Sequence, residues 1–221
     1  MELQALFLTL KLATVTTLIL LCLAVPLASW IVLGESRWRP LVEAFTGLPL
    51  VLPPTVLGFY LLVLFGPMTG IGRFLTSVLG HPLAFSFSGL VIGSVIYSFP
   101  FAVQPIVTGF SAVDPAILDA GRLLGAGPFR LARTLLIPLA KRSMITGIVL
   151  SFLHTLGEFG VVLMLGGDIP GATRTLSIVL YNQVEGFDYT SANRTAGILL
   201  VLCLAALIAV YTYPSRKRGR A

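Results

Sequence analysis

The stretch Asp114-Pro-Ala-Ile-Leu-Asp-Ala-Gly-Arg-Leu-Leu-Gly-Ala-Gly-Pro-Phe-Arg-Leu-Ala-Arg-Thr-Leu-Leu-Ile-Pro138 is the longest part of the chain that is not membrane-like. Asp114 is expected to cap a helix that begins at Pro115, where a missing N–H costs nothing. Gly125 is expected to close that helix in the left-handed conformation. Gly127-Pro128 then begins a second short helix, which Pro138 is expected to end. The stretch is therefore predicted to form a pair of short helices.

The first of these helices has one face of small and apolar residues: Ile117, Ala120, Gly121 and Leu124. Asp119 and Arg122 lie on another face. Helices of about ten residues are marginal alone in water, so the pair needs a partner surface. The small residues Ala120 and Gly121 would let another backbone come close. We therefore interpret the pair as a docking element; an ordinary amphipathic cytoplasmic hairpin is the alternative.

The composition identifies the class of protein. Of 221 residues, 56% are hydrophobic and only 11% are charged, whereas soluble domains carry about 25% charged residues. The net charge of +6 does not indicate nucleic-acid binding, because the basic residues lie in loops beside apolar stretches. Two cysteines in apolar runs and two scattered histidines give neither a disulfide nor a metal site. No phosphate-binding loop and no cofactor motif occurs, so any ATP must be bound by another chain.

Five apolar stretches are predicted to cross the membrane: 12–33, 47–66, 84–106, 143–166 and 195–213. The helix pair lies in the loop 111–142, between the third and the fourth. The expected fold is an all-α integral membrane protein with a single transmembrane domain over residues 1–221. Ala24 to Ala28 resembles a signal-peptide cleavage site, but the start of the chain lacks basic residues and the apolar run is too long. We therefore expect the first stretch to be a retained span.

The lysines and arginines give the orientation. One side of the five-span topology holds eleven of them: Arg37, Arg39, Arg122, Arg130, Arg133, Lys141, Arg142, Arg216, Lys217, Arg218 and Arg220. The other side holds only Arg73, Arg174 and Arg194, with Lys11 at the rim of the first span. The positive-inside rule then predicts an outer N-terminus, with the 111–142 loop and the C-terminus in the cytoplasm.

Prolines interrupt two of the predicted spans. Pro49, Pro53 and Pro54 are expected at the inner end of the second span, and Pro100 and Pro105 in the inner part of the third. Each removes a helical hydrogen bond whose freed carbonyl must find another partner. Helices that line a moving pathway often need such breaks, although tolerated kinks in a static bundle remain the alternative for any one proline.

The fourth span contains an ionisable pair. His154 and Glu158 are four residues apart, so on one helix they would share a face and could pair. Ionisable groups at this depth usually face the bundle interior. The pair is either a polar contact at a gate or dimer interface, or a buried pair that only satisfies itself. In the following outer loop, 176–181 is too short to span and is expected to form a re-entrant or interfacial helix, or a merely structural loop.

The spacing within the 111–142 loop resembles the EAA motif of ABC importer permeases, in which Glu-Ala-Ala, Gly, Ile and Leu-Pro stand at fixed offsets. The matching residues here are Asp119, Ala120, Gly121, Gly125, Leu135, Ile137 and Pro138. Asp for Glu, Gly for Ala, Leu for Ile and Ile for Leu are conservative changes, although Gly121 weakens its helix. The resemblance implies that this loop is the coupling helix gripped by a cytoplasmic ATPase subunit.

Segments 48–62, 156–160 and 169–175, added to 119–138, look like the permease subunit of molybdate ABC importers. The resemblance implies a type I importer fold in the bacterial inner membrane, working as a homodimer with two ATPase subunits and a periplasmic oxyanion-binding protein. Thr, Ser and backbone N–H groups near the kinked inner ends are the gate candidates. Glu158 is not expected to touch the substrate, because a carboxylate repels an anion.

Sulfate/thiosulfate, tungstate and methionine-type ABC permeases are the alternatives within this superfamily. An ATP-independent secondary carrier or a membrane scaffold is the alternative from a different class.

Overall fold

The computed structural model describes residues 2–34 and 36–212, which fold into helices joined by short turns, with no strand among these residues. The longer helices are α1 (Glu2–Leu33), α2 (Arg39–Val51), α3 (Pro54–Phe65), α4 (Gly70–Leu79), α5 (Phe87–Ser111), α9 (Lys141–Leu156), α11 (Leu176–Glu185) and α12 (Tyr189–Thr212). The shorter ones are α6 (Pro115–Leu123), α7 (Pro128–Leu131), α8 (Ile137–Leu139) and α10 (Gly160–Gly166). The predicted basic tail at 215–220 and the last residue of the span 195–213 lie outside the described residues.

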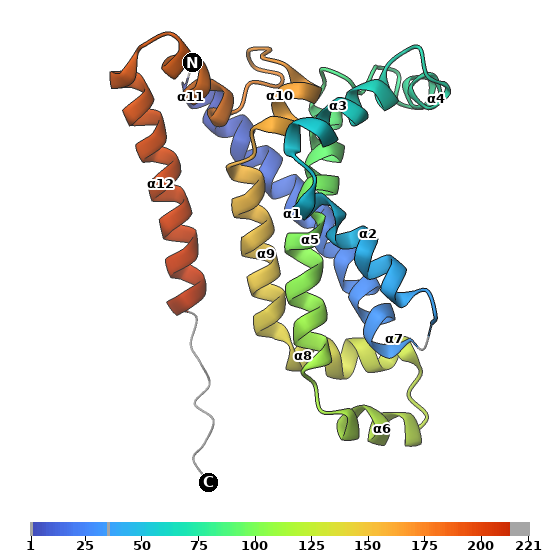
Figure 1. Cartoon of the computed structure of the whole chain (residues 1–221). Coiled ribbons are helices and arrows are strands. Elements are labelled where there is room, and N and C mark those ends of the chain that lie inside the picture. The colour runs from blue at the N-terminus through green and yellow to red at the C-terminus, as the bar shows by residue number, and fades with distance from the viewer. Residues whose placement is uncertain (1, 35, 213–221) are drawn as a thin grey trace.

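Helix α1 crosses the whole bundle and packs against α5, α9 and α11 (Figure 1). Its small residues Ala24 and Ala28 are fully buried in one core cluster with Ile106 and Phe110 of α5. Small residues at such contacts let two membrane helices approach closely. The segment that resembles a cleavage site is thus an integral part of the bundle, as expected of a retained span.

The predicted second span is not one helix. α2 and α3 meet at an angle of 109°, and the break lies between the two ends of the bundle rather than at its inner end (Figure 1). Leu52 and Pro53 are extended, with ψ of 133° and 135°. Both precede a proline, and a proline ring excludes the helical conformation from the residue before it. Pro54 then begins α3, where a missing N–H is harmless.

The predicted fourth span is also broken. α9 ends at Leu156 and α10 begins at Gly160, so residues 157–159 form a non-helical link. α5, by contrast, continues through Pro100 and Pro105 without a break. Three described helices, α1, α5 and α12, are long and apolar enough to cross a membrane, or up to five spans if each of two bent helix pairs crosses as one. The second bent pair joins Pro128–Leu139 to α9 at 80°.

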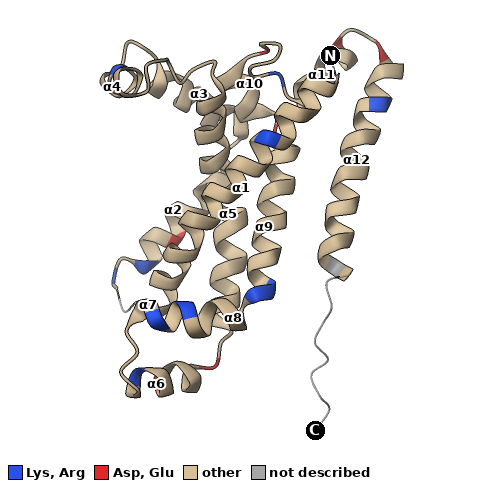
Figure 2. Ribbon diagram, turned by 180° about the vertical axis from the view of Figure 1, so that it is seen from behind, with Lys and Arg blue, Asp and Glu red and all other residues tan. Residues whose placement is uncertain are grey.

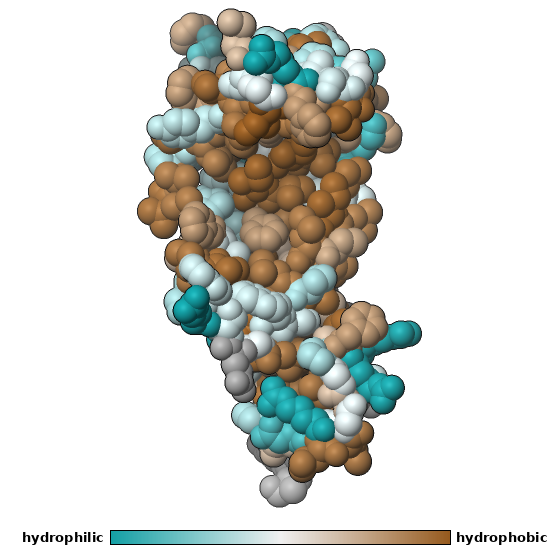
Figure 3. All heavy atoms as spheres, turned by 90° about the vertical axis from the view of Figure 1, so that its right-hand side faces the viewer, coloured by the Kyte–Doolittle hydropathy of each residue, from teal (hydrophilic) through white to brown (hydrophobic). Residues whose placement is uncertain are grey.

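Charge and hydropathy are segregated along the bundle. Lys, Arg, Asp and Glu of the described chain gather mainly at its two ends, while the middle is almost free of them (Figure 2). From the side, a broad hydrophobic band separates hydrophilic residues above and below it (Figure 3). This is the surface of a protein that sits in a bilayer with both ends in water.

Close packing of α5 on α9 depends on Gly109. A Cβ at this position would lie 2.2 Å from the Cβ of Ser143, and overpacking of this kind costs roughly 1–3 kcal/mol or more. We expect Gly109→Leu to lower the apparent melting temperature of the detergent-solubilised protein, measured by size-exclusion chromatography after heating. Gly197→Leu in α12 is the matched control, because a Cβ there meets nothing within 4 Å. Equal melting of the two variants would contradict the packing argument.

Candidate functional site

The helix α6 has the local structure that its sequence predicts. The Asp114 carboxylate accepts a hydrogen bond of 2.9 Å from the N–H of Ala116, and Gly125 is left-handed with φ of 79°. The N–H groups of Gly125 and Ala126 donate to the carbonyls of Arg122 and Gly121, which is the Schellman pattern of a helix C-terminus. The predicted start and stop of α6 are confirmed.

One residue of α6 anchors it to the bundle. Leu118 is only 7% exposed and belongs to the same core cluster as Phe110 of α5 and Leu136. A Cβ on Gly121 would lie 2.6 Å from the Leu131 side chain and 3.2 Å from that of Leu135. Gly121 thus gives room to the side chains of Leu131 and Leu135 in the second helix of the loop, so the close approach that its small size allows is within its own chain. The two helices of the loop pack on each other and on the end of α5.

The second helix of the loop does not end where the sequence predicts. α7 runs into a wider turn over Ala132–Leu136, in which the N–H of Ile137 donates to the carbonyl of Ala132. α8 then passes Pro138 and ends at Leu139, so the prediction that Pro138 ends the helix was wrong. A wide turn gives room to a proline ring, which otherwise clashes with the carbonyl four residues earlier. The chain turns into α9 at Ala140 instead.

The outer side of the loop carries an apolar surface, which we call the loop patch. It consists of Ile117, Leu123, Leu124 and Phe129, which are 41%, 89%, 85% and 80% exposed. Ala120 and Pro138 are exposed as well, and Asp119 accepts a hydrogen bond from the exposed Arg122 at 2.9 Å. An exposed ion pair of this kind adds little to stability. Large exposed apolar side chains at a charged end of the molecule indicate an interaction surface.

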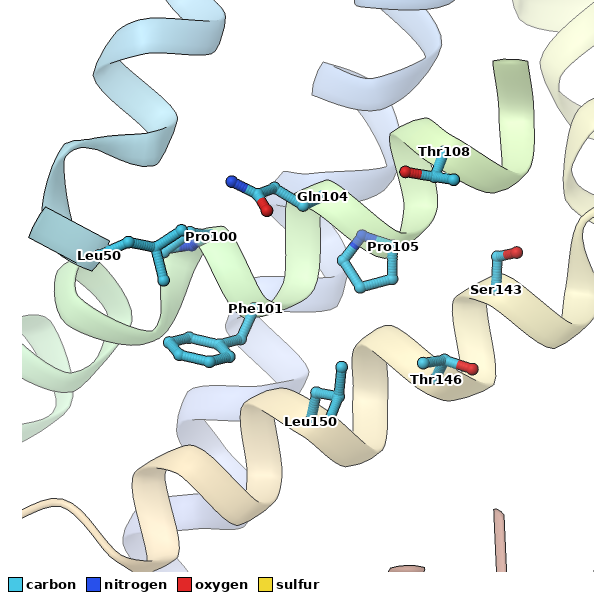
Figure 4. A pocket seen from close by; sticks show the side chains of 9 residues that line it. All are labelled: Leu50, Pro100, Phe101, Gln104, Pro105, Thr108, Ser143, Thr146 and Leu150. Carbon is cyan, nitrogen blue, oxygen red and sulfur yellow. The ribbon is translucent and has the colours of Figure 1, made fainter. Parts of the chain in front are cut away.

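A second feature is a cleft of about 440 Å³ between α5 and α9, bounded by Leu50 near the end of α2 (Figure 4). Its polar lining consists of Gln104 and Thr108 from α5 and Ser143 and Thr146 from α9. No acidic or basic side chain of the described chain lines it. Amide and hydroxyl groups can donate hydrogen bonds to an anion but bind it less strongly than a positively charged side chain does. The other five lining residues are apolar, so the cleft, which is open on one side, offers an anion a few neutral hydrogen-bond donors in a mainly apolar wall.

His154 lies behind the wall of this cleft. Its Nδ1 is 2.8 Å from the Ser98 hydroxyl, and its ring stacks on Phe101, with centroids 3.9 Å apart. Phe101 is itself a lining residue of the cleft. The predicted pairing of His154 with Glu158 does not occur, because α9 ends before Glu158 and the four-residue spacing no longer places the two on one helix face. His154 supports the cleft wall instead.

Glu158 lies in the link between α9 and α10 and is 4% exposed. Its carboxylate oxygens have no hydrogen-bond partner among the described residues, and the hydroxyl of Ser94 on α5 is a polar neighbour that stays outside hydrogen-bond geometry. Glu158 does not line the cleft.

The two helix breaks meet. A Cβ on Gly160, at the start of α10, would lie 2.9 Å from the Pro54 ring, so Pro53-Pro54 and the link at 157–159 are neighbours. The first of these breaks directly follows the end of α2 that carries Leu50 beside the cleft. The sequence patterns did not predict that these two breaks would lie next to each other.

The sequence analysis gave Thr and Ser near the kinked inner ends as gate candidates but did not identify the individual cleft residues, although a signal existed. Gln104 and Thr108 are four residues apart, and Ser143 and Thr146 are three apart, each pair within an apolar helix. Such spacing places each pair on one helix face. The sequence does not say that the two faces would meet.

Comparisons with known proteins agree with this architecture. Residues 21–213 match the family model described as binding-protein-dependent transport system inner membrane component. The molybdenum transport system permease protein ModB of Azotobacter vinelandii is 45% identical over 99% of this chain and 96% of its own. The protein of the same name from Escherichia coli K12 is 36% identical over 94% and 91%. A probable sulfate transport system permease protein of Chlorella vulgaris is 26% identical over 86% and 71%.

Solved structures show the same fold at low sequence identity. A chain of a bacterial ABC transporter involved in the import of alginate superimposes with a TM-score of 0.76 at 18% identity, over 96% of this chain and 80% of the other. A chain of the MetNI methionine ABC transporter in an inward-facing conformation gives 0.74 at 15% identity, over 95% and 92%. The fold is the all-helical one of type I ABC importer permeases, as the sequence analysis expected.

Proposed function

The chain belongs to the family of binding-protein-dependent transport system inner membrane components, and on this premise we propose that it is the membrane-spanning permease subunit of an ATP-driven molybdate importer. The observation that carries the proposal is the 45% identity, over nearly the whole of both chains, to a molybdenum transport permease. The sulfate relative is more distant at 26%, and the methionine transporter shares only the fold. Molybdate is therefore favoured over sulfate and methionine.

The proposed membrane placement is that of the positive-inside rule, with the 111–142 loop in the cytoplasm, the N-terminus outside and residues 1–221 forming one transmembrane domain. The loop patch is the proposed docking surface for an ATPase subunit. Four of the residues that match the motif are exposed on the loop: Asp119, Ala120, Gly125 and Pro138. Gly121, Leu135 and Ile137 act from within, because they hold the two helices of the loop together or against the core.

The packing supports transmission of motion from this surface to the substrate path. Leu118 ties α6 to the core cluster at the end of α5, and α8 leads directly into α9. α5 and α9 are the two main walls of the cleft. A displacement of α6 by a closing ATPase would therefore shift these walls relative to each other. ATP hydrolysis itself belongs to the partner subunit.

The cleft is half of the proposed pathway. Because it is open on one side and five spans provide too little wall for a central channel, a second copy related by a twofold axis would close it. Gln104, Thr108, Ser143 and Thr146 are the proposed polar contacts of the passing dianion. Affinity belongs to a periplasmic binding protein, so the pathway needs only weak, neutral hydrogen-bond donors.

Transport by proteoliposomes tests the proposal. The chain, reconstituted with its ATPase and binding protein, is expected to accumulate ⁹⁹Mo-labelled molybdate only when ATP is supplied. A hundredfold excess of methionine should leave uptake unchanged, and labelled sulfate should enter far more slowly than molybdate. Uptake without ATP would indicate a secondary carrier, and faster sulfate entry would make the chain a sulfate permease.

A further inference from the structure

A groove of about 540 Å³ lies between the C-terminal part of α1 and the second helix of the loop. Val25, Trp30 and Leu33 of α1 form one wall, and Phe129 and Ile137 are part of the other. The lining is almost wholly apolar. The groove is separate from the cleft and from the contact between α6 and the core, and it shares one residue, Phe129, with the loop patch. Its shape and chemistry suit a hydrocarbon chain.

One charged residue, Arg133, lines the groove. No acidic side chain of the described chain lines it, and within residues 2–34 and 36–212 the Arg133 guanidinium has no ion-pair, hydrogen-bond or ring partner. Arg39, Arg122 and Arg174, by comparison, each pair with a carboxylate of their own chain. A guanidinium beside an apolar groove offers planar donors that match a phosphate. The charge of the site is therefore complementary to a phosphodiester.

The groove lies at the boundary between the apolar band and the basic end of the bundle. α1 ends at Leu33, and Lys and Arg residues gather where α7 and α8 lie (Figure 2). Trp30 is 41% exposed, and tryptophan favours the level of the lipid headgroups. Basic pockets between membrane helices on the cytoplasmic side are a known type of binding site for anionic headgroups.

We propose that this groove binds an anionic phospholipid, with an acyl chain between α1 and the second helix of the loop and the phosphate on Arg133. The inference rests on the membrane placement proposed above, which puts this end of the bundle at the inner leaflet. Since the lipid would lie against the helix that follows α6, it would stabilise one position of the loop relative to α1. The site thereby links the charge of the membrane to the position of the loop.

Photolabelling of the purified full chain tests the site. The probes are phosphatidylglycerol with a diazirine in one acyl chain and the matching phosphatidylcholine, and the labelled peptides are mapped by mass spectrometry. We expect phosphatidylglycerol to label peptides that contain residues 25–34 and 128–137, about fivefold more strongly than phosphatidylcholine, as one arginine near the membrane surface implies. Equal labelling by the two lipids, or labelling elsewhere, would overturn the proposal.

Three variants separate the headgroup from the groove. Arg133→Gln should reduce phosphatidylglycerol labelling to the phosphatidylcholine level. Arg130→Gln removes the same charge one turn earlier, outside the groove, and should keep the preference. Ser29→Trp fills the groove and should remove labelling by both lipids, with elution on size exclusion as the check of folding. Undiminished labelling of Arg133→Gln would contradict the assignment of the phosphate.

A second arm repeats the labelling on the chain assembled with its ATPase. Retained labelling supports a lipid site in the working transporter, whereas its loss on assembly would mean that protein covers the groove and would overturn the proposal. Labelling is independent of molybdate uptake. If the lipid site fails and molybdate uptake is intact, the proposed function stands and the lipid proposal is wrong. If labelling is as expected but uptake is absent, the lipid proposal stands and the proposed function is wrong.

Discussion

Leu124→Glu is expected to separate the permease from its ATPase while the bundle stays folded. Leu124 is 85% exposed at the tip of the loop, so a glutamate there is fully hydrated in the isolated chain. In the assembled transporter the same carboxylate would be buried without a partner. Truncation of an interface anchor or burial of an unpaired charge costs roughly 3–5 kcal/mol, which weakens association about a hundredfold or more.

Co-purification of the ATPase with the tagged permease measures this effect. Met68→Glu is the matched control, because Met68 is 90% exposed in the loop between α3 and α4, on the side proposed to be external. That variant should retain the ATPase. If Leu124→Glu also retained it and supported normal uptake, the loop patch would not be the docking surface. Loss of ATPase association by both variants alike would point to a general defect.

Thr146→Glu is expected to block molybdate transport while leaving ATPase association intact. Thr146 lines the polar cleft. A carboxylate about 6 Å from a passing dianion repels it by about 5 kcal/mol at an effective dielectric constant of about 20. Since about 1.4 kcal/mol corresponds to a factor of ten, we expect uptake to fall at least a hundredfold.

Thr146→Gln separates charge from volume, because glutamine has the shape of glutamate and no charge. It should transport within about tenfold of the unmodified protein, since an amide still donates hydrogen bonds. ATPase co-purification should be unchanged in both variants, which distinguishes this defect from that of Leu124→Glu. Normal ⁹⁹Mo uptake by Thr146→Glu would remove the cleft from the pathway, and equal defects in both variants would indicate blockage by size alone.

The local features of the loop could be predicted because neighbouring residues alone determine them. The Asp114 cap and the left-handed Gly125 depend on backbone hydrogen bonds within a few residues. The helix faces were predicted only in part, because the exposure of Ile117 and Leu124 is consistent with the expected docking face, whereas the face that packs on the core was missed. Leu118, which the pattern did not single out, is the anchor to the core, whereas Ile117 and Leu124 are exposed. Periodicity identifies a face but not the neighbour that the face meets.

The breaks within the membrane helices show the same limit. Hydropathy counts apolar residues and gave continuous spans over 47–66 and 143–166, although both are interrupted. The spacing rule that paired His154 with Glu158 assumes one unbroken helix. The link at 157–159 invalidates that assumption and leaves His154 with Ser98, a residue 56 positions away. Conversely, Pro138 was expected to end a helix that a wide turn carries past it.

The amino-acid sequence by itself determined that this chain is an all-helical membrane protein with a pair of short helices, the first of them capped, between its third and fourth apolar stretches. Hydration of apolar residues and local backbone bonding are properties of short segments. Only the tertiary structure decided where the spans bend, which side chains line the cleft and which residues form the groove beside α1. The physical reason is that each of these depends on contacts between helices far apart in the chain. Pro54 against Gly160 and Gly109 against Ser143 are two such contacts.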